Sequence, residues 1–153
     1  MKLMDLGQPM KLGSGCLLVS RKTGKWLLIR RSSYVPMPLT WGLPGGRVDP
    51  GERPSDAARR ETMEETGIDL SKLPIRLIYI NDAHAPRFRF YTYACVVDGE
   101  IEPVLNWESD GHLWCGIDDL PQPLHWGVSQ LMNHGRSAKI LKKFMKEQKV
   151  FLG

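Results

Sequence analysis

Three glutamates stand close together in the segment Arg60-Glu61-Thr62-Met63-Glu64-Glu65-Thr66-Gly67. In a helix, Glu61, Glu64 and Glu65 would occupy positions i, i+3 and i+4, which share one face of about one turn. Like charges at this spacing repel one another by roughly 0.2–0.5 kcal/mol per pair. Carboxylate oxygens grouped in this way suit a hard divalent cation, Mg²⁺ or Mn²⁺, and such ions usually act on phosphates. The pattern therefore predicts a metal site for phosphate chemistry.

Two further features support a metal site over a merely solvated helix face. Gly45 and Gly46 lie upstream of the glutamates, and glycines let the backbone come close to a metal ion or a phosphate. Glu52 stands eight residues before Arg60. Without the glycines and this spacing, an ordinary exposed helix with Arg60 as the i,i+4 partner of Glu64 would be the better interpretation.

The helix that must carry the glutamates has clear ends. Pro54 suits the first helical position and Gly67 suits the stop after the last turn. On the side away from the glutamates, Ala57, Ala58 and Met63 offer a modest inner surface. We therefore expect a helix from Pro54 that packs through these three residues.

The other expected elements are mixed. Apolar runs at 15–20 and 25–30 predict a hairpin, and their continuous apolarity predicts strands covered on both faces. Further strands are expected at 75–80, 88–97 and 114–117, a loop at 32–40, and helices at 128–133 and 137–148. The class is therefore α/β or α+β, and 1–153 is expected to form a single domain.

Composition limits the setting of this chain. With 42% hydrophobic and 25% charged residues, it is typical of a water-soluble globular protein, and its net charge of +4 is mild. No apolar run approaches the roughly 18 residues that a membrane span needs, and the N-terminus lacks the apolar core of a secretory signal. Cys16, Cys95 and Cys115 are odd in number and lie in apolar surroundings, which indicates buried thiols in a reducing compartment. A cytoplasmic location is expected.

The spacing of these residues resembles the Nudix box of MutT-like hydrolases. The family pattern is Gly, five residues, Glu, seven residues, Arg-Glu, an aliphatic residue, any residue, Glu-Glu, any residue, Gly and an aliphatic residue. Gly46, Glu52, Arg60-Glu61, Glu64-Glu65 and Gly67-Ile68 match it with the correct gaps. Thr62 departs from the pattern, since an aliphatic residue is usual there. We expect this side chain to face the packing rather than the metal, so the departure should leave the chemistry intact.

This resemblance implies a fold and an activity. The fold would be a mixed sheet sandwiched between helices, with the box as a loop–helix–loop. The activity would be hydrolysis of the pyrophosphate linkage of a nucleoside diphosphate joined to another group, with Mg²⁺ or Mn²⁺. The metal ligands implied by position are Glu61, Glu64, Glu65 and the carbonyl oxygen of Gly46. Glu52 and Arg60 would be supporting residues, with the arginine orienting a glutamate.

Several residues are candidates for the remaining roles. The general base could be Glu64 or Glu65, or it could be Glu108, which precedes Trp114 where many family members carry a functional carboxylate on a loop; Glu108 is also a candidate metal ligand. Asp110 is the reserve. The candidates for substrate binding are Arg47, which could meet a phosphate, and Tyr34 and Trp126, which could stack on a base. Weaker candidates for a phosphate contact are Arg30, Arg31, Arg87 and Arg89, for which an ordinary surface position is the preferred interpretation.

The sequence leaves the substrate open. Nucleotide sugars, dinucleoside polyphosphates, ADP-ribose-like molecules and nucleoside triphosphates all fit the box. The alternative function is a non-catalytic nucleotide-binding or regulatory Nudix module, which the intact glutamates argue against. No membrane partner is expected, and no nucleic-acid partner either, because the lysines after 137 read as a solvated helix face. Many relatives dimerise, so a homodimer is to be considered, although the sequence shows no interface.

Overall fold

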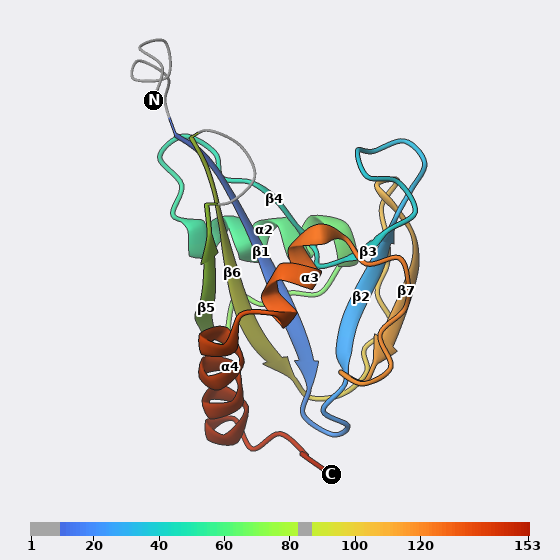
Figure 1. Ribbon diagram of the computed structural model, residues 1–153, viewed down its shortest axis with the longest axis vertical. Coiled ribbons are helices and arrows are strands. Elements are labelled where there is room, and N and C mark those ends of the chain that lie inside the picture. Colours follow the sequence, from blue (N-terminus) through green and yellow to red (C-terminus); the bar gives the residue numbers. More distant parts are fainter. Residues whose placement is uncertain (1–9, 83–86) are drawn as a thin grey trace.

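Seven strands form one mixed sheet in the computed structural model, which describes residues 10–82 and 87–153 (Figure 1). The strands are β1 (Lys11–Ser20), β2 (Trp26–Arg31), β3 (Trp41–Gly42), β4 (Gly45–Arg47), β5 (Ile75–Asn81), β6 (Phe88–Val97) and β7 (Ser109–Cys115). The helices are α2 (Pro54–Thr66), α3 (Trp126–Met132) and α4 (Gly135–Glu147).

The sheet runs in the order β3-β2-β1-β6-β5, with β4 paired to β1 and β7 paired to β2. β1 and β6 are parallel along ten residue pairs, and the other pairings are antiparallel. The predicted hairpin is confirmed at its turn, where Val19 pairs with Trp26. Beyond that point β1 continues with β4 and β6 while β2 continues with β3 and β7, so the sheet splays open between them (Figure 1).

β1 is covered on both faces, as its continuous apolarity predicts. Leu17 and Val19 pack with residues of α3 and α4, including Leu131 and Phe144. Alternate residues point to opposite faces of a strand, so Cys16 and Leu18 pack on the other side, against Ala58 of α2. The sheet therefore lies between helices on its two faces, and the predicted fold class is confirmed.

The helix that carries the glutamates begins and ends as predicted, with Pro54 in its first turn and Gly67 in the left-handed conformation (φ 71°) after its last residue. Ala57 and Ala58 are fully buried. The prediction for Met63 is wrong, since its side chain is 50% exposed. Thr62 lies on the buried face instead, and its hydroxyl donates a 2.7 Å hydrogen bond to the carbonyl oxygen of Ala58. The residue that departs from the family pattern therefore faces the packing, as expected.

Several other boundaries differ from the prediction. β1 begins at Lys11, four residues before the predicted start at 15. β7 begins at Ser109 and ends at Cys115, earlier than expected, because pairing with β2 recruits the polar residues that precede Trp114. The last two helices start earlier as well. His125 and His134 cap them, accepting hydrogen bonds from the main-chain nitrogens of Gly127 and Ser137. Caps of this type are outside the usual Ser, Thr, Asp and Asn signal.

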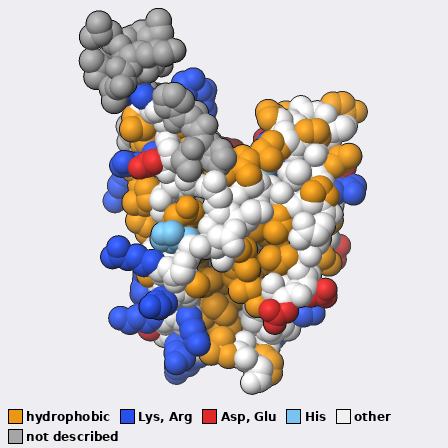
Figure 2. Space-filling view, in the orientation of Figure 1, with side chains coloured by type: hydrophobic (Ala, Val, Ile, Leu, Met, Phe, Trp, Pro, Cys, Tyr) orange, Lys and Arg blue, Asp and Glu red, His pale blue; other side chains and the backbone are white. Residues whose placement is uncertain are grey.

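Two further features concern the surface and the thiols. The lysines of α4 are exposed, and blue side chains gather over this helix on the lower left of Figure 2. The three cysteines are buried and free. Within the described part of the chain, none of the helices has the length and apolarity that crossing a bilayer requires.

Candidate active site

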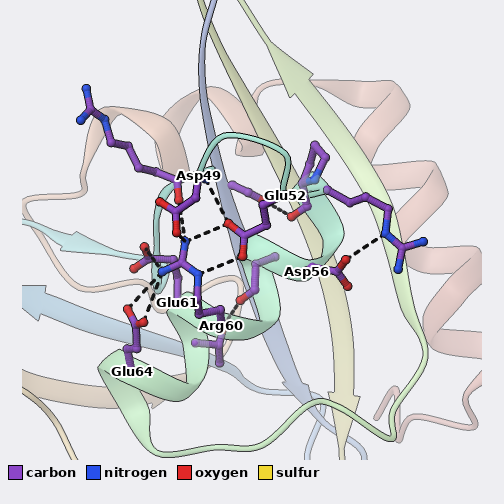
Figure 3. A network of polar contacts seen from close by, with 12 residues as sticks. Asp49, Glu52, Asp56, Arg60, Glu61 and Glu64 are labelled. Atoms are coloured by element: carbon purple, nitrogen blue, oxygen red, sulfur yellow. Dashed lines mark hydrogen bonds and ion pairs between the residues drawn. The ribbon is translucent and has the colours of Figure 1, made fainter.

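Arg60 stands at the centre of the acidic face of α2 (Figure 3). Its Nε and Nη2 donate to the two carboxylate oxygens of Glu52 at 2.9 and 3.0 Å. Its Nη1 donates to Glu61 at 3.1 Å and to Glu64 at 3.3 Å, and its Nη2 also reaches the carbonyl oxygen of Arg47 at 2.9 Å. The hydrogen bonds from Arg60 lower the pKa of the Glu52 carboxyl. One guanidinium thus ties the loop before α2 to two glutamates of the helix.

The double glycine lies directly against the other side of this cluster. The main-chain nitrogen of Gly45 donates a 2.9 Å hydrogen bond to Oε2 of Glu65. A methyl group added to Gly46 would lie 2.6 Å from Cδ of Glu61 and 2.7 Å from both of its oxygens. Contacts this short exclude any side chain larger than glycine without displacement of Glu61. The backbone of β4 therefore approaches the carboxylates as closely as the sequence predicts.

Glu61 and Glu65 share a partly desolvated position. Glu65 is 5% exposed, and burial is the main reason that its pKa is raised; the charges of Glu61 and Glu108 raise it further, while the hydrogen bond from Gly45 opposes them. Burial also raises the pKa of Glu61, and Arg60 opposes this rise. Two carboxyl groups in direct contact, both with raised pKa values, form a site that a cation would stabilise.

The donor set fits a divalent cation of the Mg²⁺ or Mn²⁺ type, although the side chains are not gathered around one point. Within residues 10–82 and 87–153, no three Asp, Glu, His or Cys side chains stand together as a metal-ligating group. Glu64 accounts for this, because its carboxylate turns to Arg60 and is half exposed. Glu61 and Glu65 are already together, and the close approach of Gly46 leaves its backbone beside them. Oxygen ligands alone are the set that these ions prefer.

Glu108 reaches the cluster from a distant part of the chain. Its carbonyl oxygen accepts a 2.9 Å hydrogen bond from the nitrogen of Ser32, which fixes the loop before β7 against the end of β2. Its charge acts on both Glu65 and Arg31. Asp110, the reserve candidate, is turned away and forms a 2.7 Å ion pair with Arg30. The structure thus brings Glu108 to the cluster and Asp110 to a separate partner.

A cavity of about 500 Å³ opens beside the double glycine. Among the predicted substrate-binding residues, Arg47 and Trp126 line it together with Gly46. Tyr34 is not among the described residues that line this cavity, and its side chain is 83% exposed on the loop between β2 and β3. The cavity therefore joins the acidic cluster to the start of α3.

The sequence ranked one charged residue of the cavity too low and did not indicate the far wall of the cavity. Arg31, expected to be ordinary surface, lines the cavity, donates a 2.6 Å hydrogen bond to the carbonyl oxygen of Pro36, and has its pKa lowered by burial. The far wall is made by side chains of β5 and β6, namely Tyr79, Asn81, Phe88, Phe90 and Thr92. Alternation along β2 could have separated Arg31 from Arg30, because neighbouring residues of a strand point to opposite faces.

Comparison with known proteins identifies related sequences. The family model of the NUDIX domain matches residues 9–134. The chain is 34% identical over 110 residues to a protein of Rattus norvegicus named bis(5'-nucleosyl)-tetraphosphatase (asymmetrical). The matched region covers 68% of this chain and 72% of that protein.

Solved structures agree with these sequence matches. The crystal structure of a MutT NUDIX hydrolase from Burkholderia pseudomallei is 31% identical, with a TM-score of 0.66 over 84% of this chain and 98% of that chain. The crystal structure of a Nudix hydrolase from M. smegmatis gives a TM-score of 0.72 over 86% of this chain and 87% of that chain, and at 24% identity it shows the shared fold.

Proposed function

This chain belongs to the Nudix family of hydrolases, and from that premise we propose that it hydrolyses the pyrophosphate linkage of a nucleoside diphosphate derivative with a divalent cation. The single observation that carries the proposal is the contact of Glu61 and Glu65 against the backbone of Gly46, which itself lines the cavity. We take 1–153 as one catalytic domain.

The residues that would hold the cation are Glu61, Glu65, Glu64 and the carbonyl oxygen of Gly46, with Glu108 as a further carboxylate. Such an ion, Mg²⁺ or Mn²⁺, would neutralise negative charge on the phosphates when bound. Arg60 orients the Glu61 carboxylate and opposes the rise in its pKa, and Glu52 in turn holds Arg60 through two hydrogen bonds. Glu64 would leave Arg60 to join the site, a small movement for a half-exposed side chain.

Hydrolysis requires a water to attack phosphorus while the bond from phosphorus to the bridging oxygen breaks. The water gives its proton to a carboxylate, and Glu65, Glu64 and Glu108 are the bases that the geometry supports. Arg47 and Arg31 line the same cavity and would balance charge on the phosphates. Trp126, the first residue of α3, also lines the cavity and would contact the nucleoside.

Dinucleoside polyphosphates are the first substrates to test, because the relative from Rattus norvegicus is named for a nucleosyl tetraphosphate. Nucleotide sugars, ADP-ribose and nucleoside triphosphates complete the panel. We also take the compartment to be the reducing cytoplasm, which three buried free thiols support.

The test is turnover of this panel with Mg²⁺ and with Mn²⁺, followed by chromatography of the nucleotide products. Glu64→Gln and Glu65→Gln should each lower kcat by two or more orders of magnitude and weaken Mn²⁺ binding in calorimetry. Glu147→Gln is the matched control, because Glu147 lies at the end of α4 and pairs with Arg76 of β5, away from the cluster. Wild-type turnover in both active-site variants would refute the proposed function.

A further inference from the structure

One row of paired residues crosses four strands along the wall of the cavity. Arg47 of β4 pairs with Gly13 of β1, and Gly13 pairs with Phe90 of β6. Phe90 in turn pairs with Asn81 of β5. All four residues line the cavity. Residues directly opposite one another in a sheet point to the same face, and neighbouring strands lie about 4.8 Å apart, so the row spans about 14 Å.

This span is comparable with the length of an extended nucleoside diphosphate. The Arg47 end lies beside Gly46 and the acidic cluster, so phosphates belong there. A nucleotide whose phosphates meet Arg47 would therefore carry its base toward Asn81. The row places the base-binding end of the cavity at the ends of β5 and β6 rather than at the exposed Tyr34 loop.

The middle of the row is a flat aromatic surface. A methyl group added to Gly13 would lie 2.6 Å from Cδ2 of Phe90, and one added to Gly15 would lie 3.2 Å from Cζ of the same ring. The Phe90 ring therefore lies across β1, in space that the two glycines leave open. Phe88 and Tyr79 line the cavity beside it. Aromatic faces of this kind stack on any nucleobase and so favour bases without choosing among them.

The side-chain carboxamide of Asn81 can distinguish one nucleobase from another. Its side chain is buried (7% exposed) yet borders the cavity, and its Nδ2 donates a hydrogen bond to Oε1 of Gln130 in α3. A carboxamide presents a donor and an acceptor side by side, which is complementary to adenine, with its acceptor ring nitrogen next to a donor amino group. This hydrogen bond from Nδ2 of Asn81 to Gln130 opposes rotation of the Asn81 amide into the reverse order, which would suit a base with a carbonyl in that position.

We propose that Asn81, oriented by Gln130, selects adenine as the base of the substrate. The inference rests on the proposed function in taking the Arg47 end as the phosphate end. It goes beyond that function in naming an adenine nucleotide and the residue that recognises it.

Binding of AMP and IMP tests the inference without turnover, because neither contains a pyrophosphate linkage. IMP replaces the amino group of adenine by a carbonyl oxygen, which would face the acceptor of Asn81. Calorimetry with Mg²⁺ should show that the wild-type protein binds AMP roughly tenfold more tightly than IMP. In Asn81→Ala and in the nearly isosteric Asn81→Asp, the ratio should fall toward one.

The controls separate loss of selection from loss of structure. Asn133→Ala removes an exposed carboxamide at the end of α3 and should keep the wild-type ratio. Ribose 5-phosphate, a ligand without a base, should bind all variants equally. Asn81→Asp carries the test if Asn81→Ala does not fold, as judged by circular dichroism.

Equal binding of AMP and IMP by the wild-type protein would overturn the inference, as would a wild-type ratio in a folded Asn81 variant. Neither result would touch the proposed function, which depends on turnover and on the glutamates. Conversely, AMP selection in a protein that hydrolyses nothing in the panel would support the role of Asn81 and refute the proposed function.

Discussion

The main-chain nitrogen of Gly45 and Oε2 of Glu65 are joined by a 2.9 Å hydrogen bond, which ties β4 to the last turn of α2. The bond places the next residue, Gly46, over the carboxylate of Glu61. Strand and helix thus hold the buried carboxyl group of Glu65 and the partly buried one of Glu61 between them. The position of the acidic cluster depends on this packing as well as on the spacing of the glutamates along the helix.

Arg60→Ala should destabilise the protein. The side chain of Arg60 is 31% exposed and serves three glutamates, so its removal leaves partly buried carboxylates without their partner. We expect the free energy of unfolding to fall by about 2 kcal/mol in urea titrations. Arg53→Ala is the control, since Arg53 is 80% exposed and its ion pair with Asp56 should contribute less than about 1 kcal/mol. Equal losses in the two variants would contradict this role for Arg60.

The stability of the metal-free protein should fall as pH rises above the ordinary range of a carboxyl group. The folded pKa of Glu65 is raised from 4.5 to about 9, so its contribution is complete below the unfolded pKa and is lost as pH rises through the folded pKa. The free energy of unfolding should therefore decline between about pH 5 and pH 9, and Glu65→Gln should flatten the decline. Chemical denaturation in EDTA at several pH values measures this. A wild-type profile no steeper than that of the variant would count against it.

Gly46→Ala should weaken binding of the divalent cation. The added methyl group would meet the Glu61 carboxylate at 2.6–2.7 Å, so the carboxylate must move. We expect a loss of at least about tenfold in Mn²⁺ affinity, which corresponds to about 1.4 kcal/mol, measured by calorimetry. Gly116→Ala is the matched control, because no heavy atom of the described chain lies within 4 Å of its added methyl group. Unchanged affinity in Gly46→Ala would separate Gly46 from the metal site.

Substitutions of the two adjacent arginines, Arg30 and Arg31, should differ sharply in their effect on catalytic activity. Arg31 lines the cavity near Glu65 and Glu108, whereas Arg30 points to the opposite face and pairs with Asp110. Arg31→Leu should lower kcat/KM by roughly tenfold to a hundredfold through loss of a charge-assisted phosphate contact. Arg30→Leu should stay within about twofold of wild type by the same reasoning, since no such contact is lost. Steady-state kinetics on the best substrate of the panel decides, and a reversed order would reject the assignment.

Much of the acidic site could be predicted because it is local. Pro54 and Gly67 set the ends of α2, and the spacing of the glutamates within one turn places them on one face whatever the rest of the chain does. The prediction for Met63 fails because it follows residue type rather than position in the helix. An apolar side chain predicts burial, but the helical period puts Thr62 on the buried face, one turn after Ala58, and puts Met63 next to the exposed Glu64.

The far wall of the cavity could not be predicted, because it depends on which strands become neighbours.

The sequence by itself determined the chemistry: the residue types and intervals from Gly46 to Gly67 specify carboxylates, a close backbone and a helix to hold them. Only the tertiary structure determined which other residues surround the acidic site and line the cavity beside it. Parallel pairing of β1 with β6 aligns Arg47, Gly13 and Phe90 with Asn81, and the loop before β7 brings Glu108 to Glu65. Helical spacing follows from local geometry, whereas strand register and loop contacts follow from the packing of distant segments against one core.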